Sequence, residues 1–245
     1  MIRATIDVTI AREALALDAG YARLCALVAS LAAVHPSLRA WYALADTRNG
    51  PAIPLQDKAA FLADVLAEQT GMDAQDRGFC AMLSTAPDDR AWLRPGRALL
   101  SFAPNQGYLT YEVYDPIAAH GAAGTTELFK RALRAIAQSQ PVLFAATDVN
   151  ARLRSGKGVT MYAGEHQLFA HRRWLGWMGV VPQPVEPRHL PEAAAVLPLG
   201  RHGTLIVAVD ACFDLHDPEH LRRAHSVEAR MAHIGLLDVV DDALR

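Results

Sequence analysis

Gly203-Thr-Leu-Ile-Val-Ala-Val209 and, a few residues later, Asp217-Pro-Glu-His220 form the best-specified part of the sequence. The first stretch is a short, β-rich apolar run entered through glycine, which predicts a fully buried strand. In the second stretch, Asp217 is a natural N-cap, Pro218 fits the first helical position, and Glu219 favours the positive end of the helix dipole. Apolar residues then recur at steps of three and four, so the helix should bury one face: Leu221, Ala224, Val227, Met231 and Ile234. The pattern predicts a strand–helix unit, and it contains no obvious chemistry.

Further landmarks surround this unit. Trp174-Leu-Gly-Trp177-Met-Gly179 precedes Pro182, and Leu190-Pro-Glu192 lies before the strand. The landmarks within and after the helix are Asp217-Pro-Glu-His220, Arg223-Ala224, Glu228 and Leu236-Leu237. With these residues the last third of the chain resembles the immunity protein 52 family. The resemblance implies a cytoplasmic antitoxin of the kind encoded beside type VI secretion effectors that have a restriction-endonuclease-like toxin domain.

The remainder of the chain predicts paired strands mixed with single helices. Strands are expected at 2–10, 41–46, 97–103, 108–114, 141–146 and 159–162, with hairpin turns at 104–107 and 155–158. Helices are expected at 12–35 with a break near Gly20, at 57–71 with Asp57 as the cap, and from Thr125 onward, with one helical turn at 79–83. Strands and helices do not alternate strictly, which favours an α+β fold with a mostly antiparallel sheet. We expect a single domain, 1–245, with possible related halves 1–140 and 141–245, because strand–helix units recur in the first and last thirds.

Composition excludes several classes of protein. The 245 residues are 51% hydrophobic and 20% charged, as in an ordinary globular protein. A net charge of -2 provides no basic stripe for nucleic acid. Cys25, Cys80 and Cys212 are an odd, scattered set, which indicates free thiols in a reducing compartment. The apolar run 24–34 is shorter than the roughly 18 residues of a membrane span and has acidic residues before it. We therefore expect a cytoplasmic protein that binds neither nucleic acid nor membrane.

The stretches that suggest catalysis at first sight lack the required patterns. Arg154-Ser-Gly-Lys157-Gly158 has no glycine six residues before the lysine and no Ser or Thr after it, so a hairpin turn is favoured over a phosphate loop. His216 and His220 straddle the expected start of a helix, and no ligand set with zinc-type spacing occurs. A Gly-x-Ser-x-Gly nucleophile motif is also missing. The sequence predicts no catalytic residue, no metal and no cofactor.

Two irregular, acidic segments are the candidates for contact with a toxin. The first holds Asp88, Asp89 and Trp92, and the second is the tail with Asp238, Asp241 and Asp242. A tryptophan beside arginines on a loop has the composition of an interface anchor, although a ring folded back onto the core is the alternative. The other three tryptophans are expected in the core: Trp41, Trp174 and Trp177.

Two functional hypotheses follow. The first is an immunity protein, not an enzyme, that holds its toxin in a stoichiometric complex. The second is a small α+β enzyme whose site residues are dispersed along the chain, since acid/base pairs can be assembled in three dimensions without a local motif.

Overall fold

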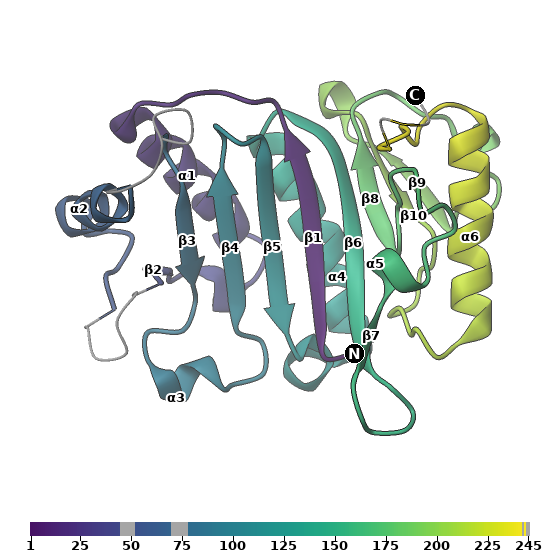
Figure 1. The fold of residues 1–245 in the computed structure, drawn as a ribbon, viewed down its shortest axis with the longest axis horizontal. Coiled ribbons are helices and arrows are strands. Elements are labelled where there is room, and N and C mark those ends of the chain that lie inside the picture. The colour runs from purple at the N-terminus through teal and green to yellow at the C-terminus, as the bar shows by residue number, and fades with distance from the viewer. Residues whose placement is uncertain (45–51, 70–77, 242, 244–245) are drawn as a thin grey trace.

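The computed structural model describes residues 1–44, 52–69, 78–241 and 243, and its main feature is one large antiparallel sheet (Figure 1). The strand order is β2-β3-β4-β5-β1-β6-β8-β10-β9, with β7 paired to β6. The strands are β1 Arg3–Ile10, β2 Tyr42–Ala43, β3 Ala81–Ser84, β4 Ala98–Ala103, β5 Tyr108–Tyr114, β6 Val142–Arg152, β7 Val159–Met161, β8 Met178–Val181, β9 Ala195–Pro198 and β10 Thr204–Val207. The N-terminal strand lies in the middle, between β5 and β6.

Helices lie on both faces of the sheet, at different places. They are α1 Leu17–Ala32, α2 Lys58–Glu68, α3 Asp89–Trp92, α4 Pro116–Ser139, α5 Tyr162–Glu165 and α6 Pro218–His233, with short 3-10 turns at Pro36–Leu38, Pro187–His189 and Gly200–His202. Figure 1 shows α1 and α4 behind the sheet, and α6 in front at the β9–β10 end. None of the described helices lies in front of β4, β5 and β1.

The core lies mainly between the sheet and α4. Ala4, Ile6, Val8 and Ile10 alternate along β1 and are all buried. On α4 the ring of Phe129 contacts Tyr111 of β5, with the ring centroids 6.1 Å apart. The residues between the buried positions of β1 therefore point to the opposite face of the sheet.

The predicted fold class, α+β with a mostly antiparallel sheet, is confirmed. Both predicted hairpins form, because β4 pairs with β5 and β6 pairs with β7. Asp57 caps α2 by accepting a hydrogen bond from the amide of Ala60 (3.2 Å). Among the described residues, no helix has both the length and the apolar composition needed to cross a membrane.

Four element predictions are wrong in detail. The first helix begins at Leu17 instead of Arg12, and it continues through Gly20 without a break. The expected helical turn at 79–83 is instead strand β3. The helix expected from Thr125 begins at Pro116, and a non-helical Gly121 (φ 70°) kinks it. Strand β6 extends to Arg152, six residues beyond the predicted end at Ala146. Of the strand expected at 41–46, Tyr42–Ala43 forms, while residues 45–46 and the expected helix stop at Gly71 lie outside the described residues.

The C-terminal unit forms as predicted, and its landmarks have structural roles. The Asp217 carboxylate accepts from the amide of Glu219 (2.9 Å) and caps α6. Trp177 is fully buried, and its indole N–H donates to the carbonyl of Val209 (2.9 Å). A side chain at Gly176 (φ +66°) would meet the carbonyl oxygen of Thr147 at 2.3 Å, so only glycine fits there.

Glu228 is the least expected member of this unit, because it is a charged residue on the buried face of α6 with 1% of its surface exposed. One carboxylate oxygen accepts from the amides of Leu175 (2.8 Å) and Gly176 (3.0 Å), and the other from the amide of Leu168 (3.1 Å). These hydrogen bonds of Glu228 link the 168–176 segment to α6. The same segment forms one wall of the site described next.

Candidate functional site

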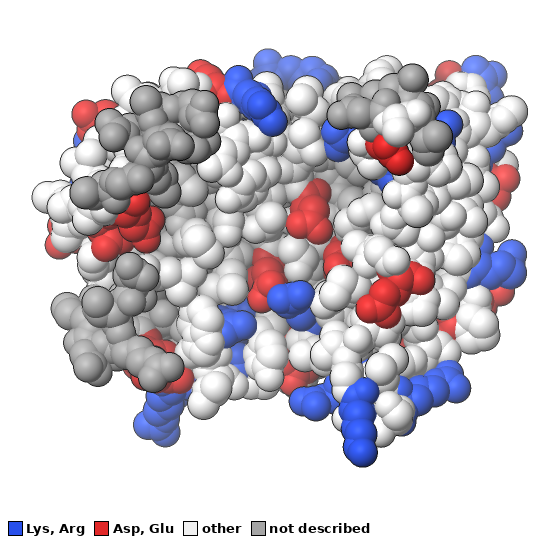
Figure 2. All heavy atoms as spheres, viewed as in Figure 1, with Lys and Arg blue, Asp and Glu red and all other residues white. Residues whose placement is uncertain are grey.

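The front face of the sheet, opposite α4, is the candidate site. Arg3, Thr5, Asp7 and Thr9 of β1 project toward it, since their neighbours in the strand point to the core. In the register, Thr5 lies between Glu112 of β5 and Asp148 of β6. Asp7 is two residues further along β1, so Glu112 and Asp148 are its diagonal neighbours. Three carboxylates therefore lie near one another on three adjacent strands, and Figure 2 shows acidic side chains near the middle of this hollowed face.

The carboxylates differ in their partners. Glu112 is paired with Arg3 (3.2 Å) and lies 3.9 Å from Arg97. Asp148 accepts a hydrogen bond from the amide of Ala163 (3.1 Å). The side chain of Asp7 forms neither a hydrogen bond nor a salt bridge with the described residues. Of these three carboxylates, Asp7 is therefore the one available to bind a group from another molecule.

The electrostatic surroundings disfavour the charged form of Asp7. Burial raises the pKa of Asp7 from its ordinary value of 3.8 to about 6, with Asp148 adding to the rise, Arg3 opposing it and Glu112 adding less. Burial also raises the pKa of Asp148, although backbone amides partly offset this effect. A carboxyl group with a raised pKa beside a cavity is a candidate for a functional residue.

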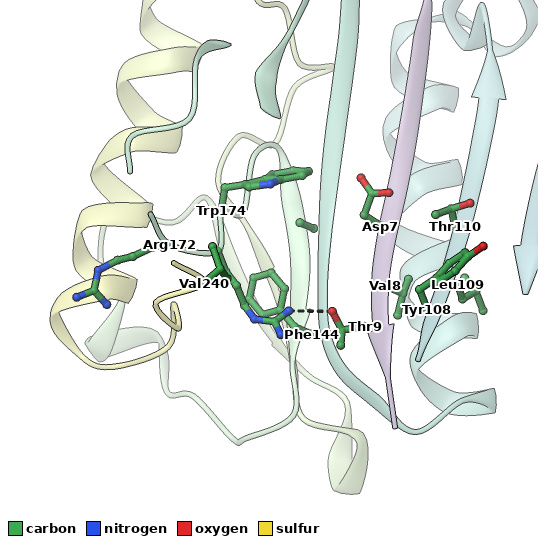
Figure 3. A pocket seen from close by; sticks show the side chains of 12 residues that line it. Asp7, Val8, Thr9, Tyr108, Leu109, Thr110, Phe144, Arg172, Trp174 and Val240 are labelled. Atoms are coloured by element: carbon green, nitrogen blue, oxygen red, sulfur yellow. Dashed lines mark hydrogen bonds between the residues drawn. The ribbon is translucent and has the colours of Figure 1, made fainter. Parts of the chain in front are cut away.

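A pocket of about 330 Å³ opens next to Asp7, and its floor consists of β5, β1 and β6 (Figure 3). Phe144 and Ala146 of β6 and Tyr108 and Thr110 of β5 line the floor. The opposite wall is the 172–174 segment together with Val240 of the C-terminal tail. In Figure 3 the Trp174 ring reaches over the pocket toward the strand that bears Asp7, whereas Arg172 points away.

Arg173 closes one side of the pocket and is itself neutralised. Its guanidinium lies 5.1 Å from the ring centroid of Phe144, donates to the hydroxyl of Thr9 (2.8 Å) and pairs with Asp238 (3.3 Å). The amide of Arg173 also donates to the carbonyl of Asp238 (2.9 Å). The tail is therefore attached to the pocket wall by both backbone and side chain.

The structure does not bring the two predicted contact segments together. Asp88 and Asp89 lie at α3, near the lower corner of the sheet, whereas the tail lies at the opposite upper corner (Figure 1). The Asp88 carboxylate caps α3 by accepting from the amide of Ala91 (2.7 Å), so part of its hydrogen-bonding capacity is already used. Asp241 is exposed and accepts from the amide of Ala243 (2.9 Å). Asp242 lies outside the described residues.

Each segment is nevertheless connected to the front face through an arginine. Arg97 stacks on the half-buried Trp92 ring, with its guanidinium carbon 4.0 Å from the ring centroid, and it also approaches Glu112. Arg173 makes the corresponding link between Asp238 and Thr9. Trp92 is thus partly covered by an arginine, while Trp41 and Trp177 are buried as predicted and Trp174 is half-buried.

The sequence gives no local motif for Asp7, Glu112 or Asp148. Each is a lone carboxylate in its own strand. The available signal was that Asp7 occupies a polar position of the alternating run 2–10, which places it on the face opposite the core. Within the described part of the chain, no three His, Cys, Asp or Glu side chains are grouped so that they could hold a metal ion.

Comparisons with known proteins give a distant structural similarity. No family model matches the chain, and no curated protein matches it. Among solved structures, a T6SS protein of Pseudomonas aeruginosa aligns with 93% of this chain and 75% of its own length, with a TM-score of 0.48 and 11% sequence identity. An overlap of this extent at this identity defines neither a family nor a function.

Proposed function

We propose that this chain is an immunity protein that binds and neutralises a cognate secreted toxin. The toxin is of the restriction-endonuclease-like DNase class delivered by type VI secretion, and neutralisation is by stoichiometric occlusion. The proposal begins from the resemblance to the immunity protein 52 family. Several residues that make up this resemblance have specific places in the C-terminal unit: Trp177, Asp217, Glu228 and Leu237.

The observation that favours a binding role is the uncovered, acidic front face of the sheet. A nuclease needs a basic cleft, because contacts to phosphates dominate affinity for DNA. A surface with a central carboxylate cluster is complementary to such a cleft, and complementary charge favours rapid and specific association. Occlusion of this kind requires no catalytic residue, metal or cofactor, and it involves neither DNA nor membrane as a partner.

The contact surface in this proposal is the front face together with its two rims. The α3 segment with Asp88, Asp89 and Trp92 forms one rim, and the tail with Asp238, Asp241 and Asp242 forms the other. We expect these rim residues to contribute little to the binding free energy, because Asp88 and Asp238 already have partners within the chain. Asp7, whose side chain has no partner among the described residues, is better placed for the core of an interface, where a few desolvated residues dominate binding.

A small enzyme is the second candidate function. The observation that favours it is the raised pKa of Asp7 beside a cavity, a combination typical of general acids and bases. The two functions differ in the amount of protein that they need, because an enzyme that modifies the toxin turns over and an occluding inhibitor does not.

The test uses the toxin encoded next to this gene, co-expressed with variants of the chain. Thr110→Arg places a long cation on the front face, and it should abolish both growth protection and co-purification of the toxin. The control Glu127→Arg places the same side chain on α4, behind the sheet, and should preserve both. Melting curves verify that both variants fold. Protection by a folded Thr110→Arg protein would show that the toxin binds elsewhere.

A further inference from the structure

The pocket beside Asp7 has the chemistry of a receptor for a cation. It combines one carboxylate without a partner among the described residues with the aromatic rings of Trp174 and Tyr108, while the ring of Phe144 already contacts the guanidinium of Arg173. Aromatic faces attract guanidinium and ammonium groups, and the attraction grows when water is excluded. A volume of about 330 Å³ suits one side chain more than an extended ligand.

We propose that this pocket receives an arginine or lysine side chain of the partner protein, with Asp7 as its counter-ion and Trp174 as its aromatic wall. The proposal rests on the proposed function, because it identifies how the toxin would be anchored on the front face.

The charges around the pocket support a cationic occupant over an anionic one. On the sheet, the carboxylates Asp7, Glu112 and Asp148 face two guanidiniums, Arg3 and Arg97, and both of these approach the same carboxylate, Glu112. On this part of the sheet three negative charges face two positive charges, which leaves one negative charge in excess before the arginines of the pocket wall are counted.

Both arginines of the pocket wall already have partners. Arg173 is paired with Asp238 at 3.3 Å, and Arg172 points away from the pocket and donates to the carbonyl of Leu237 (2.9 Å). An incoming cation therefore meets Asp7 without displacing an existing salt bridge.

The state of Asp7 in the free protein agrees with this role. Burial and two neighbouring carboxylates raise the pKa of Asp7 to about 6, which means that they destabilise its charged form. A bound cation would offset that destabilisation and lower the pKa again. The fold thus retains a carboxylate whose negative charge Arg3 offsets only in part, so a bound cation would stabilise it further.

The experiment measures toxin affinity for three proteins: wild type, Asp7→Asn and the control Glu127→Gln on the opposite side of the sheet. Asp7→Asn preserves the shape of the side chain and removes its charge. It should weaken binding at least about 30-fold, as expected when one member of a desolvated charge pair is removed. Glu127→Gln should bind like the wild type.

A second measurement uses a capped Gly-Arg-Gly peptide as the probe and the matching citrulline peptide as its neutral control, with the fluorescence of the tryptophans as the signal. The arginine peptide should bind at least about tenfold more tightly to the wild type, a difference of about 1.4 kcal/mol. Asp7→Asn should abolish this preference. The proposal is overturned if Asp7→Asn binds the toxin as tightly as the wild type, or if the arginine peptide binds no better than the citrulline peptide.

The two arms separate this inference from the proposed function. If the toxin binds tightly and Asp7→Asn does not change its affinity, the pocket is not the anchoring site, while the proposed immunity function still stands. Selective binding of the arginine peptide by a chain that does not bind the neighbouring toxin supports the pocket and rejects the proposed partner.

Discussion

Replacement of Glu228 by alanine should destabilise the protein more than any exposed substitution on the same helix. The carboxylate is buried and accepts hydrogen bonds from the amides of Leu168, Leu175 and Gly176. Glu228→Ala would leave three backbone donors unpaired, and each unpaired buried donor costs about 1–3 kcal/mol. Part of this cost is offset because the mutant no longer buries a charge. We expect a net loss of about 3–5 kcal/mol in the free energy of unfolding, similar to the loss of one partner from a buried ionic pair.

The assay is urea unfolding followed by tryptophan fluorescence, whose signal includes Trp174 within the 168–176 segment and Trp177 directly after it. Glu228→Gln should lose less than Glu228→Ala, because the amide retains one acceptor oxygen at the same place. Glu127→Ala, on the exposed surface of α4, is the control and should change stability by no more than about 0.5 kcal/mol. If Glu228→Ala unfolds at the wild-type urea concentration, the carboxylate does not hold the 168–176 segment and the reasoning is refuted.

Four further outcomes are expected. Asp217→Ala should cost about 1 kcal/mol in urea unfolding because α6 loses its cap; an unchanged midpoint would contradict this. Trp177→Ala should cost about 3–5 kcal/mol because the ring is fully buried, while toxin affinity of the folded fraction, measured by calorimetry, is preserved. Asp7→Asn should stabilise the protein at neutral pH by up to about 3 kcal/mol, since one pKa unit is about 1.4 kcal/mol and the folded-state pKa is raised from 3.8 to about 6. The native state holds this proton more tightly, so wild-type stability falls as pH rises through that window, and the advantage of Asp7→Asn should vanish near pH 4. Chelator should leave the melting temperature of untagged protein unchanged, and a near-stoichiometric metal by elemental analysis would contradict this.

The C-terminal unit could be predicted from sequence because its signals are local. A cap at Asp217, a proline at the next position and apolar residues at helical spacing act within a few residues of one another. The two hairpins were predictable for the same reason, since their turns join adjacent strands.

The start of α1 depends on contacts between distant segments. The amide of Ala11 donates to the carbonyl of Pro141 (3.2 Å), and the amide of Glu13 donates to the carbonyl of Pro104 (2.8 Å). These bonds keep residues 11–13 outside the helix although their composition suits one. Strand β3 is not predictable from the sequence, because the periodicity of a short apolar run does not distinguish a strand from a helical turn.

The candidate site was hidden from the sequence for a topological reason. Asp7, Glu112 and Asp148 are separated by long stretches of chain, and they meet only because β1 inserts between β5 and β6. The landmarks of the family resemblance behave differently. Trp177, Asp217 and Glu228 all have roles in packing, capping or fastening, so they define a fold and contain no information about the surface that meets a partner.

Stoichiometry tests the central claim of occlusion most directly. Purified chain is titrated into a fixed amount of the toxin encoded beside it, and cleavage of DNA is measured at each ratio. An inhibitor that acts by occupancy does not turn over, so cleavage should fall linearly and stop near one chain per toxin. Full protection at a small fraction of that ratio would mean that the chain modifies the toxin catalytically, and it would contradict occlusion.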